Sequence, residues 1–245
     1  MLTDKMEKQG HWLFKYRGVL PIILLFVGTG LYLRTEIDPS TWFLENTPYE
    51  IYYEMACLLI GLSGFIIRAY TVGYSPDNTS GRNTQEQVAD VLNTTGIYSI
   101  VRNPLYIGNF FMWVAVALLT GNFWFVGAFV LFYILYYERI IVAEEKFLLS
   151  KFGNEYTEWA KKTPVVFPAF RKFKKPGLKF NWKKVLRQEK NGLAALFFIF
   201  CFDDIIGEII QHTRHYNYFL IAACITTLLG YCILKYMKYN TSLLR

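Results

Sequence analysis

Six long hydrophobic stretches constrain this chain more than any other feature. They occupy Val19–Leu33, Ile51–Ile67, Tyr106–Leu119, Phe123–Val142, Leu193–Ile210 and Tyr218–Leu234. An α-helix needs about 20 mostly apolar residues to cross a bilayer, and each stretch approaches that length. The first stretch lacks a small-residue cleavage site and is followed by Arg34, so we interpret it as a membrane helix rather than a signal peptide. We therefore expect an all-α membrane protein with roughly six transmembrane helices.

The net charge of +7 is distributed in a way that indicates membrane orientation. If the N-terminus is cytoplasmic and the six stretches alternate, 24 of the 26 Lys and Arg residues lie on the cytoplasmic side. Only Arg34 and Arg214 then lie outside. This asymmetry follows the positive-inside rule and predicts cytoplasmic N- and C-termini, in a bacterial inner membrane or the endoplasmic reticulum. The excess charge is thereby explained, and we expect no nucleic-acid partner.

The four cysteines lie inside apolar stretches and show no CxxC spacing. They are Cys57, Cys201, Cys224 and Cys232. Such cysteines are typical small buried hydrophobic residues, so the sequence predicts neither a disulfide framework nor a zinc site.

The fifth stretch carries an unusual set of acidic residues. Asp204, Glu208 and His212 are spaced i, i+4 and i+8, so they share one helix face, and Asp203 is adjacent. Carboxylates at membrane depth usually face the interior of a bundle or water. Three interpretations stay open: a metal or proton site, pairing with polar groups of the bundle, and a stretch that only dips into the membrane interface.

A helical hairpin occupies the centre of the chain. Only Thr120-Gly121-Asn122 separates Tyr106–Leu119 from Phe123–Val142, so the two helices are expected to be antiparallel neighbours. Such a hairpin returns to the side of the bilayer on which it began. It therefore brings the polar segment Gly96–Gly108, which opens the hairpin, close to the polar cluster that ends it. That cluster comprises Arg139, Glu144, Glu145 and Phe152-Gly153-Asn154-Glu155-Tyr156.

The residue types in this pocket suit a zwitterionic cofactor that carries adenine and a cationic sulfur. Arginine pairs with carboxylate or phosphate, tyrosine stacks on a base or covers a cation, and glutamate holds an ammonium group or ribose hydroxyls. Proline is tolerated in the first helical turn, and glycine permits close approach of backbone or ligand. The predicted cofactor site comprises Gly96, Tyr98, Arg102, Asn103, Pro104, Tyr106, Gly108, Glu144 and Glu145. A plain ion pair between Arg102 and Glu144 that closes the hairpin is the alternative.

These motifs resemble those of the integral membrane methyltransferases typified by isoprenylcysteine carboxyl methyltransferase and phospholipid methyltransferase. The resemblance rests on Gly96–Gly108, on Glu144-Glu145-x-x-Leu148-x-x-x-Phe152-Gly153-x-x-Tyr156, and on Pro164 and Pro168. It implies that S-adenosylmethionine (SAM) binds on the cytosolic side between the hairpin and the connector that follows, and that the acceptor enters from the bilayer. It divides the chain into an N-terminal interfacial segment with the first transmembrane helix (1–54), a methyltransferase core (55–170), and a basic connector with a C-terminal transmembrane hairpin (171–245).

The chain departs from the family pattern at three places. It has Arg102-Asn103-Pro104 where the family usually has Arg-His-Pro, and asparagine cannot act as a base near neutral pH. Trp159 stands where tyrosine is common, and Pro164–Pro168 replaces a Pro-Arg-x-x-Pro segment. The resemblance makes Arg139 and Glu145 the candidate catalytic residues, with the role of orienting the acceptor.

The absence of a histidine from the predicted pocket bears on the acceptor. A carboxylate or phosphate needs no general base, whereas an amine must first lose a proton. We therefore favour an anionic oxygen on a membrane lipid or lipidated molecule, and leave prenylcysteine, phospholipid and lipid A phosphate open. The loop Ser80–Thr84 and the basic connector Arg171–Lys190 agree with an anionic lipid substrate, although the connector also suits a simple juxtamembrane anchor.

Two other functional classes stay open at this point. Membrane sterol reductases share a similar Arg-His-Pro-x-Tyr-x-Gly core but bind NADPH. The adjacent glutamates disfavour that reading because carboxylates repel a nucleotide phosphate. A non-catalytic membrane scaffold of the same fold is the second alternative, and Asn103 is the residue that supports it.

Overall fold

The computed structural model describes residues 2–44, 47–77, 79, 87–212 and 215–241. Every regular element within these residues is helical, which confirms the all-α prediction. The helices are α1 (Leu2–Lys15), α2 (Leu20–Ile37), α3 (Glu50–Gly73), α4 (Pro104–Leu119), α5 (Phe123–Phe152), α6 (Asn154–Lys162), α7 (Trp182–Gln211) and α8 (Tyr218–Asn240). Three single 3-10 turns span Pro39–Thr41, Ile97–Ser99 and Phe170–Lys172.

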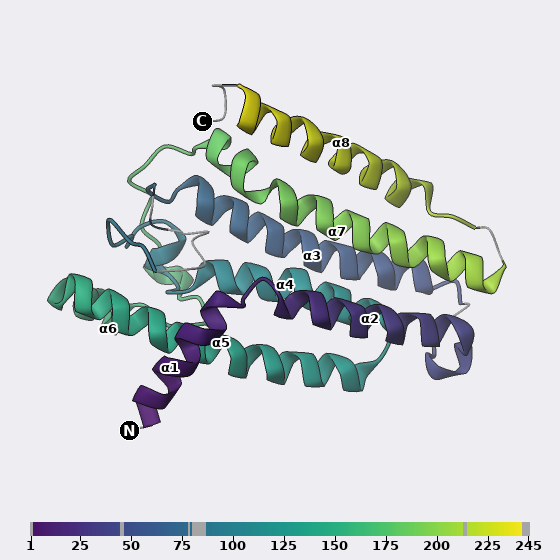
Figure 1. Ribbon diagram of the computed structural model, residues 1–245, viewed down its shortest axis with the longest axis horizontal. Coiled ribbons are helices and arrows are strands. Elements are labelled where there is room, and N and C mark those ends of the chain that lie inside the picture. Colours follow the sequence, from purple (N-terminus) through teal and green to yellow (C-terminus); the bar gives the residue numbers. More distant parts are fainter. Residues whose placement is uncertain (1, 45–46, 78, 80–86, 213–214, 242–245) are drawn as a thin grey trace.

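Six of these helices run side by side along the long axis of the molecule, as Figure 1 shows for α2, α3, α4, α5, α7 and α8. α3 packs on both α4 and α7, α7 carries α8 at the edge of the bundle, and α2 contacts α7 and α4. α1 packs on α5, and α6 continues from α5 at the same end of the molecule (Figure 1). Each predicted hydrophobic stretch therefore lies within one of the six bundle helices.

Length and composition qualify three of the described helices as candidate membrane spans: α3, α5 and α8. α4 is apolar throughout, but its 16 residues are fewer than the 20 or so that a perpendicular span requires. α7 contains 30 residues, and its first three turns are polar. The predicted number of six transmembrane helices therefore stays a prediction.

Asparagine side chains fix the starts of three helices. Asn122, Asn181 and Asn217 each accept a hydrogen bond from the backbone N–H three residues later, which caps α5, α7 and α8 respectively. α4 begins with Pro104, whose missing N–H would have no helical partner at this position.

Two glycines allow α3 and α4 to approach each other closely. A Cβ atom at Gly64 would lie 2.5 Å from the carbonyl oxygen of Gly108, and one at Gly108 would lie 2.5 Å from Cγ of Arg68. The sequence predicted that Gly108 permits approach of backbone or ligand, and the structure places the backbone of α3 there. Gly108 thus serves helix packing.

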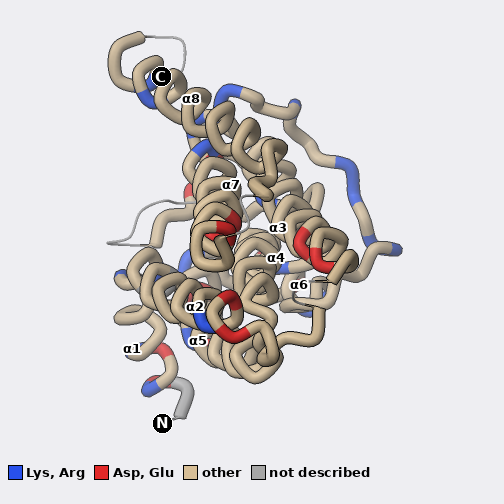
Figure 2. The backbone as a smooth tube through the Cα atoms, turned by 90° about the vertical axis from the view of Figure 1, so that its right-hand side faces the viewer, with Lys and Arg blue, Asp and Glu red and all other residues tan. Residues whose placement is uncertain are grey.

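The segment that follows α6 is hydrogen-bonded to the segment that precedes α4. The backbone N–H of Arg102 donates to Pro164 O (2.9 Å), that of Ala169 to Ile100 O (2.9 Å), and that of Gly96 to Lys174 O (3.0 Å). Trp159 adds a bond from Nε1 to Tyr98 O (3.0 Å). Figure 2 shows Lys and Arg positions spaced along this connector at the side of the bundle. The two sequence motifs therefore form one folded unit.

Candidate active site

A cavity of about 760 Å³ lies among the bundle helices, beside this unit. Its volume falls within the range of about 300–1,000 Å³ that is typical of small-molecule sites. Its walls come from every described helix except α6 and α8, from the turn between α1 and α2, and from Thr79, the segment 87–89, Tyr98, Arg102 and Asn103. Among the predicted cofactor residues, those that line it are Tyr98, Arg102, Asn103, Pro104, Tyr106 and Glu144.

The two adjacent glutamates of α5 face different partners. Tyr106 Oη donates a hydrogen bond of 2.6 Å to Oε1 of Glu144, which lies against the cavity. Arg102 Nη1 lies 2.7 Å from Oε1 of Glu145, and both side chains are partly shielded from solvent. The sequence analysis offered an ion pair between Arg102 and Glu144 as the alternative to a cofactor site. The structure instead pairs Arg102 with Glu145. Glu144 therefore keeps an oxygen that can serve a ligand.

Two tyrosines outside the long helices stay protonated beside these carboxylates. Burial raises the pKa of Tyr98, and the nearby negative charge of Glu144 adds to the shift. Burial also raises the pKa of Tyr156 to about 12, and the charge of Glu145 acts in the same direction. Both phenols are therefore neutral hydrogen-bond donors at physiological pH.

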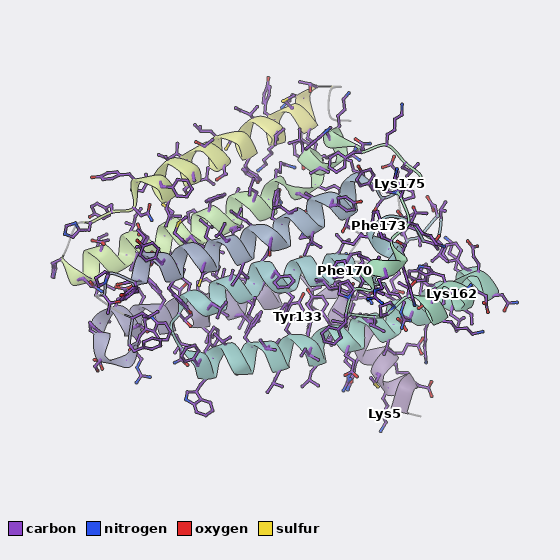
Figure 3. The ribbon with its side chains drawn as sticks, turned by 180° about the vertical axis from the view of Figure 1, so that it is seen from behind. Lys5, Tyr133, Lys162, Phe170, Phe173 and Lys175 are labelled. Carbon is purple, nitrogen blue, oxygen red and sulfur yellow. The ribbon has the colours of Figure 1, made fainter. Side chains whose placement is uncertain are left out.

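A stack of tyrosines between α4 and α5 holds Tyr106 in place. The rings of Tyr106 and Tyr137 lie 4.6 Å apart, and those of Tyr133 and Tyr137 lie 4.3 Å apart in a stacked arrangement. Tyr133 Oη donates to the carbonyl oxygen of Tyr106 (2.7 Å), and Figure 3 shows Tyr133 between the two helices. The wall of the cavity at Tyr106 is therefore rigid and aromatic.

A buried ion pair that the sequence did not predict lies deeper in the cavity. Arg68 of α3 donates from Nε (2.7 Å) and Nη2 (2.8 Å) to the two carboxylate oxygens of Glu189 in α7. Its Nη1 donates to Asn109 of α4. Glu189 is only 2% exposed, and all three residues line the cavity. They join α3, α4 and α7 at one point.

Beyond this ion pair the cavity becomes apolar. α4 contributes Met112, Trp113 and Val116, and α7 contributes Ala195, Leu196 and Ile199. The cavity therefore joins a polar end beside Tyr98, Arg102 and Glu144 to an apolar end between membrane helices. Such a shape suits a polar cofactor together with a lipid chain.

The remaining predicted site residues lie outside the cavity lining. Gly96 has a φ of +61° and pairs with Lys174 across an isolated bridge, so its role is in the turn. Glu145 reaches the cavity only through Arg102. Arg139 pairs with the neighbouring Glu138 (2.6 Å) on the partly exposed face of α5. The loop Ser80–Thr84 lies outside the described residues.

Two acidic residues of the fifth stretch accept backbone hydrogen bonds at the far end of α7, whereas Oδ1 of the neighbouring Asp203 is buried without a hydrogen-bond partner among the described residues. Asp204 accepts from the N–H of Asn217 (3.3 Å), and Glu208 accepts from that of His215. Asp203 is 2% exposed. Within the described residues no group of three His, Cys, Asp or Glu side chains is arranged to hold a metal ion. These contacts join Asp204 and Glu208 to the segment that leads into α8, so the interpretation of pairing with polar groups of the bundle stays a prediction.

Comparison with known proteins points to one family. The model of the phospholipid methyltransferase family matches residues 52–155. The protein-S-isoprenylcysteine O-methyltransferase of Schizosaccharomyces pombe is 32% identical over 131 residues, which cover 51% of this chain and 53% of the yeast protein. The corresponding Saccharomyces cerevisiae enzyme is 31% identical and shares 46% and 48% of the two chains. This chain thus spans about half the length of these two relatives.

A longer match links the chain to a bacterial protein. The nickel-cobalt-cadmium resistance protein NccN of Alcaligenes xylosoxydans xylosoxydans is 30% identical over 166 residues, which cover 67% of this chain and 68% of the relative. No solved structure gives a significant match.

Proposed function

This chain belongs to the integral membrane methyltransferase family that includes the phospholipid and isoprenylcysteine methyltransferases, and we propose that it transfers a methyl group from SAM to a lipid or lipidated acceptor. The observation that carries the proposal is the single cavity with a polar end and an apolar end. A soluble cofactor and a membrane-embedded acceptor must meet in one enclosed space for the methyl group to pass between them.

The residues at the polar end fit SAM. Arg102 suits its carboxylate, Glu144 suits its ammonium group or ribose hydroxyls, and the face of Tyr106 suits a base or a cation. The side-chain nitrogen of Gln87 is buried and has no hydrogen-bond partner among the described residues, so it can serve a ligand acceptor. When bound, SAM supplies an electrophilic methyl group attached to a positively charged sulfur.

The chain contributes positioning and exclusion of water. The tyrosine stack and the connector hold Tyr106 and Arg102 in fixed positions, and apolar side chains of α4 and α7 line the other end of the cavity. No histidine occurs among the described residues that line the cavity, and the side chain of Asn103 donates to Val165 O (3.4 Å). These features support an acceptor with an anionic oxygen, which requires no general base.

The orientation in the membrane forms part of the proposal. At the polar end of the cavity, the backbones of Tyr98 and Arg102 are bonded to Trp159 and Pro164, so this end lies beside α6 and the segment that follows it. The positive-inside rule assigns that side to the cytoplasm. Just before the basic connector, Phe167 and Phe170 are exposed in the segment between Lys162 and Arg171. This combination suits contact with an anionic leaflet.

Calorimetric titration of the detergent-purified protein tests the proposal. We expect micromolar binding of SAM and of its demethylated product, and no binding of NADPH. Binding of NADPH alone would assign the chain to the reductases, and a lack of binding of all three would favour the non-catalytic scaffold. Labelled methyl groups transferred to membrane lipids would then identify the acceptor.

A further inference from the structure

Arg68 is held at the boundary between the polar and apolar parts of the cavity. Of its five N–H groups, two donate to Glu189 and one to Asn109, and the remaining two have no acceptor among the described residues. The side chain of Arg68 retains 20% exposure although the residue lies within the helix bundle, and it lines the cavity. A guanidinium that is fixed by Glu189 and Asn109 and keeps two N–H groups unpaired within the described residues is arranged to bind an anionic oxygen.

The surroundings of Arg68 match the shape of an anionic lipid. In α4, Asn109 is followed by Met112, Trp113 and Val116, which point into the same cavity one to two turns further from the polar end. In α7, Glu189 is followed about two to three turns later by the lining residues Ala195, Leu196 and Ile199. A head group at Arg68 would therefore place its hydrocarbon chain along the apolar surfaces of α4 and α7.

We propose that Arg68, held by Glu189 and Asn109, is the subsite that binds the anionic oxygen of a lipid or lipidated acceptor, either a carboxylate or a phosphate. The inference rests on the proposed methyl transfer and adds where the acceptor is recognised. It also assigns a function to α7. This helix lies outside residues 52–155, the part of the chain that the family model matches. Arg68 binds the acceptor directly, whereas Glu189 is a positioning residue.

Pairs of amphiphiles that differ only in charge test the subsite. The probes are dodecyl phosphate against dodecanol, and N-acetyl-S-farnesylcysteine against its methyl ester, each titrated into protein in nanodiscs of zwitterionic lipid. We expect the protein to bind the anionic member of at least one pair about tenfold or more tightly than its neutral counterpart. The pair with the larger ratio distinguishes a phosphate from a carboxylate. Inorganic phosphate should not compete, and competition at equal concentration would overturn the assignment to a lipid.

The double substitution Arg68→Gln/Glu189→Gln replaces the charged pair by two amides, so that no buried charge is left alone. We expect it to abolish the anionic preference and to leave the affinity for SAM within about twofold. Lys184→Gln is the matched control. Lys184 lies on the same helix outside the cavity lining, and its Nζ joins α7 to the carbonyl oxygens of Ser75 and Pro76 (2.8 Å each). Its substitution loosens the attachment of α7 and should preserve the preference.

Each outcome separates this inference from the proposed function. Retention of the anionic preference in the double variant would overturn the subsite, and so would an equal loss in Lys184→Gln, since the effect would then come from loosening of α7. A melting temperature and an elution profile close to those of the unaltered protein establish that each variant is folded. Failure of the unaltered protein to bind SAM would overturn the proposed methyl transfer. The preference for anionic over neutral amphiphiles is measured in a separate titration that does not depend on SAM.

Discussion

At the scale of single residues, the polar end of the cavity depends on the different directions of two adjacent glutamates. Successive residues of an α-helix point about 100° apart, so Glu144 and Glu145 cannot face the same partner. Glu144 receives the hydroxyl of Tyr106 and faces the cavity, while Glu145 pairs with Arg102 and is close to Tyr156. We infer that Glu144 contacts the cofactor and that Glu145 orders the segment that carries Arg102.

Substitution of Glu144 by glutamine should weaken SAM binding by roughly ten- to a hundredfold, since a hydrogen bond to a charged group contributes about 1.5–3 kcal/mol. The matched control is Glu138→Gln in the same helix, because Glu138 is half exposed, pairs with Arg139 and does not line the cavity. The SAM affinity of the Glu138→Gln variant should equal that of the unaltered protein. Calorimetric titration measures both, and equal affinities for the two variants would contradict the placement of the cofactor.

At the scale of helices, the close contact between α3 and α4 depends on the absence of side chains at Gly64 and Gly108. Gly64→Ala should lower stability by about 1–3 kcal/mol, because the added methyl group would meet the backbone of α4. Gly230→Ala in α8 has open space around it and should be neutral or stabilising by up to about 1 kcal/mol. Melting temperatures in detergent provide the comparison, and equal melting temperatures would argue against this packing.

The sequence predicted the helices that contain long apolar stretches. Long apolar stretches identified α2, α3, α4, α5, α7 and α8, and the short turn at Thr120–Asn122 identified the hairpin. α1 was expected only as an interfacial lead-in. It is a helix because it packs on α5, where Lys146 pairs with Asp4 (3.2 Å) and Glu7 (2.6 Å). α1 is amphipathic but polar on average, so a search for long apolar stretches overlooks it.

The candidate site shows the same division between local motifs and distant contacts. Motif spacing brought Tyr98, Arg102, Tyr106 and Glu144 to one cavity. Arg68 and Glu189 are separated by 121 positions, and their pairing depends on how α7 folds back onto α3. Arg68 carried no signal of its own, since an arginine at the end of an apolar helix can extend its charge into the interface without a partner. The partner itself could not be named without the fold.

At the scale of the whole molecule, the polar end of the cavity, α6 and the connector lie at one end of the bundle, and the 3-10 turn Pro39–Thr41 lies at the other (Figures 1 and 3). A cofactor made in the cytoplasm can reach the polar end only if that end faces the cytoplasm. The distribution of Lys and Arg residues favours this orientation, since 24 of the 26 fall on one side of the predicted topology. The charge distribution thus favours the orientation that the proposed binding of SAM requires.

Cysteine labelling tests this orientation directly. In a Cys232→Ser background, which removes the one exposed cysteine of the described residues, single cysteines replace Lys5, Ser40 or Lys175. A membrane-impermeant maleimide should label the cysteine at position 40 in intact cells, and those at 5 and 175 only after permeabilisation. Labelling of positions 5 and 175 from outside would invert the topology and remove the cavity from cytoplasmic SAM. Labelling of 5 and 175 on opposite sides would contradict the bundle itself, because α1 and the connector share one end of the molecule (Figure 3).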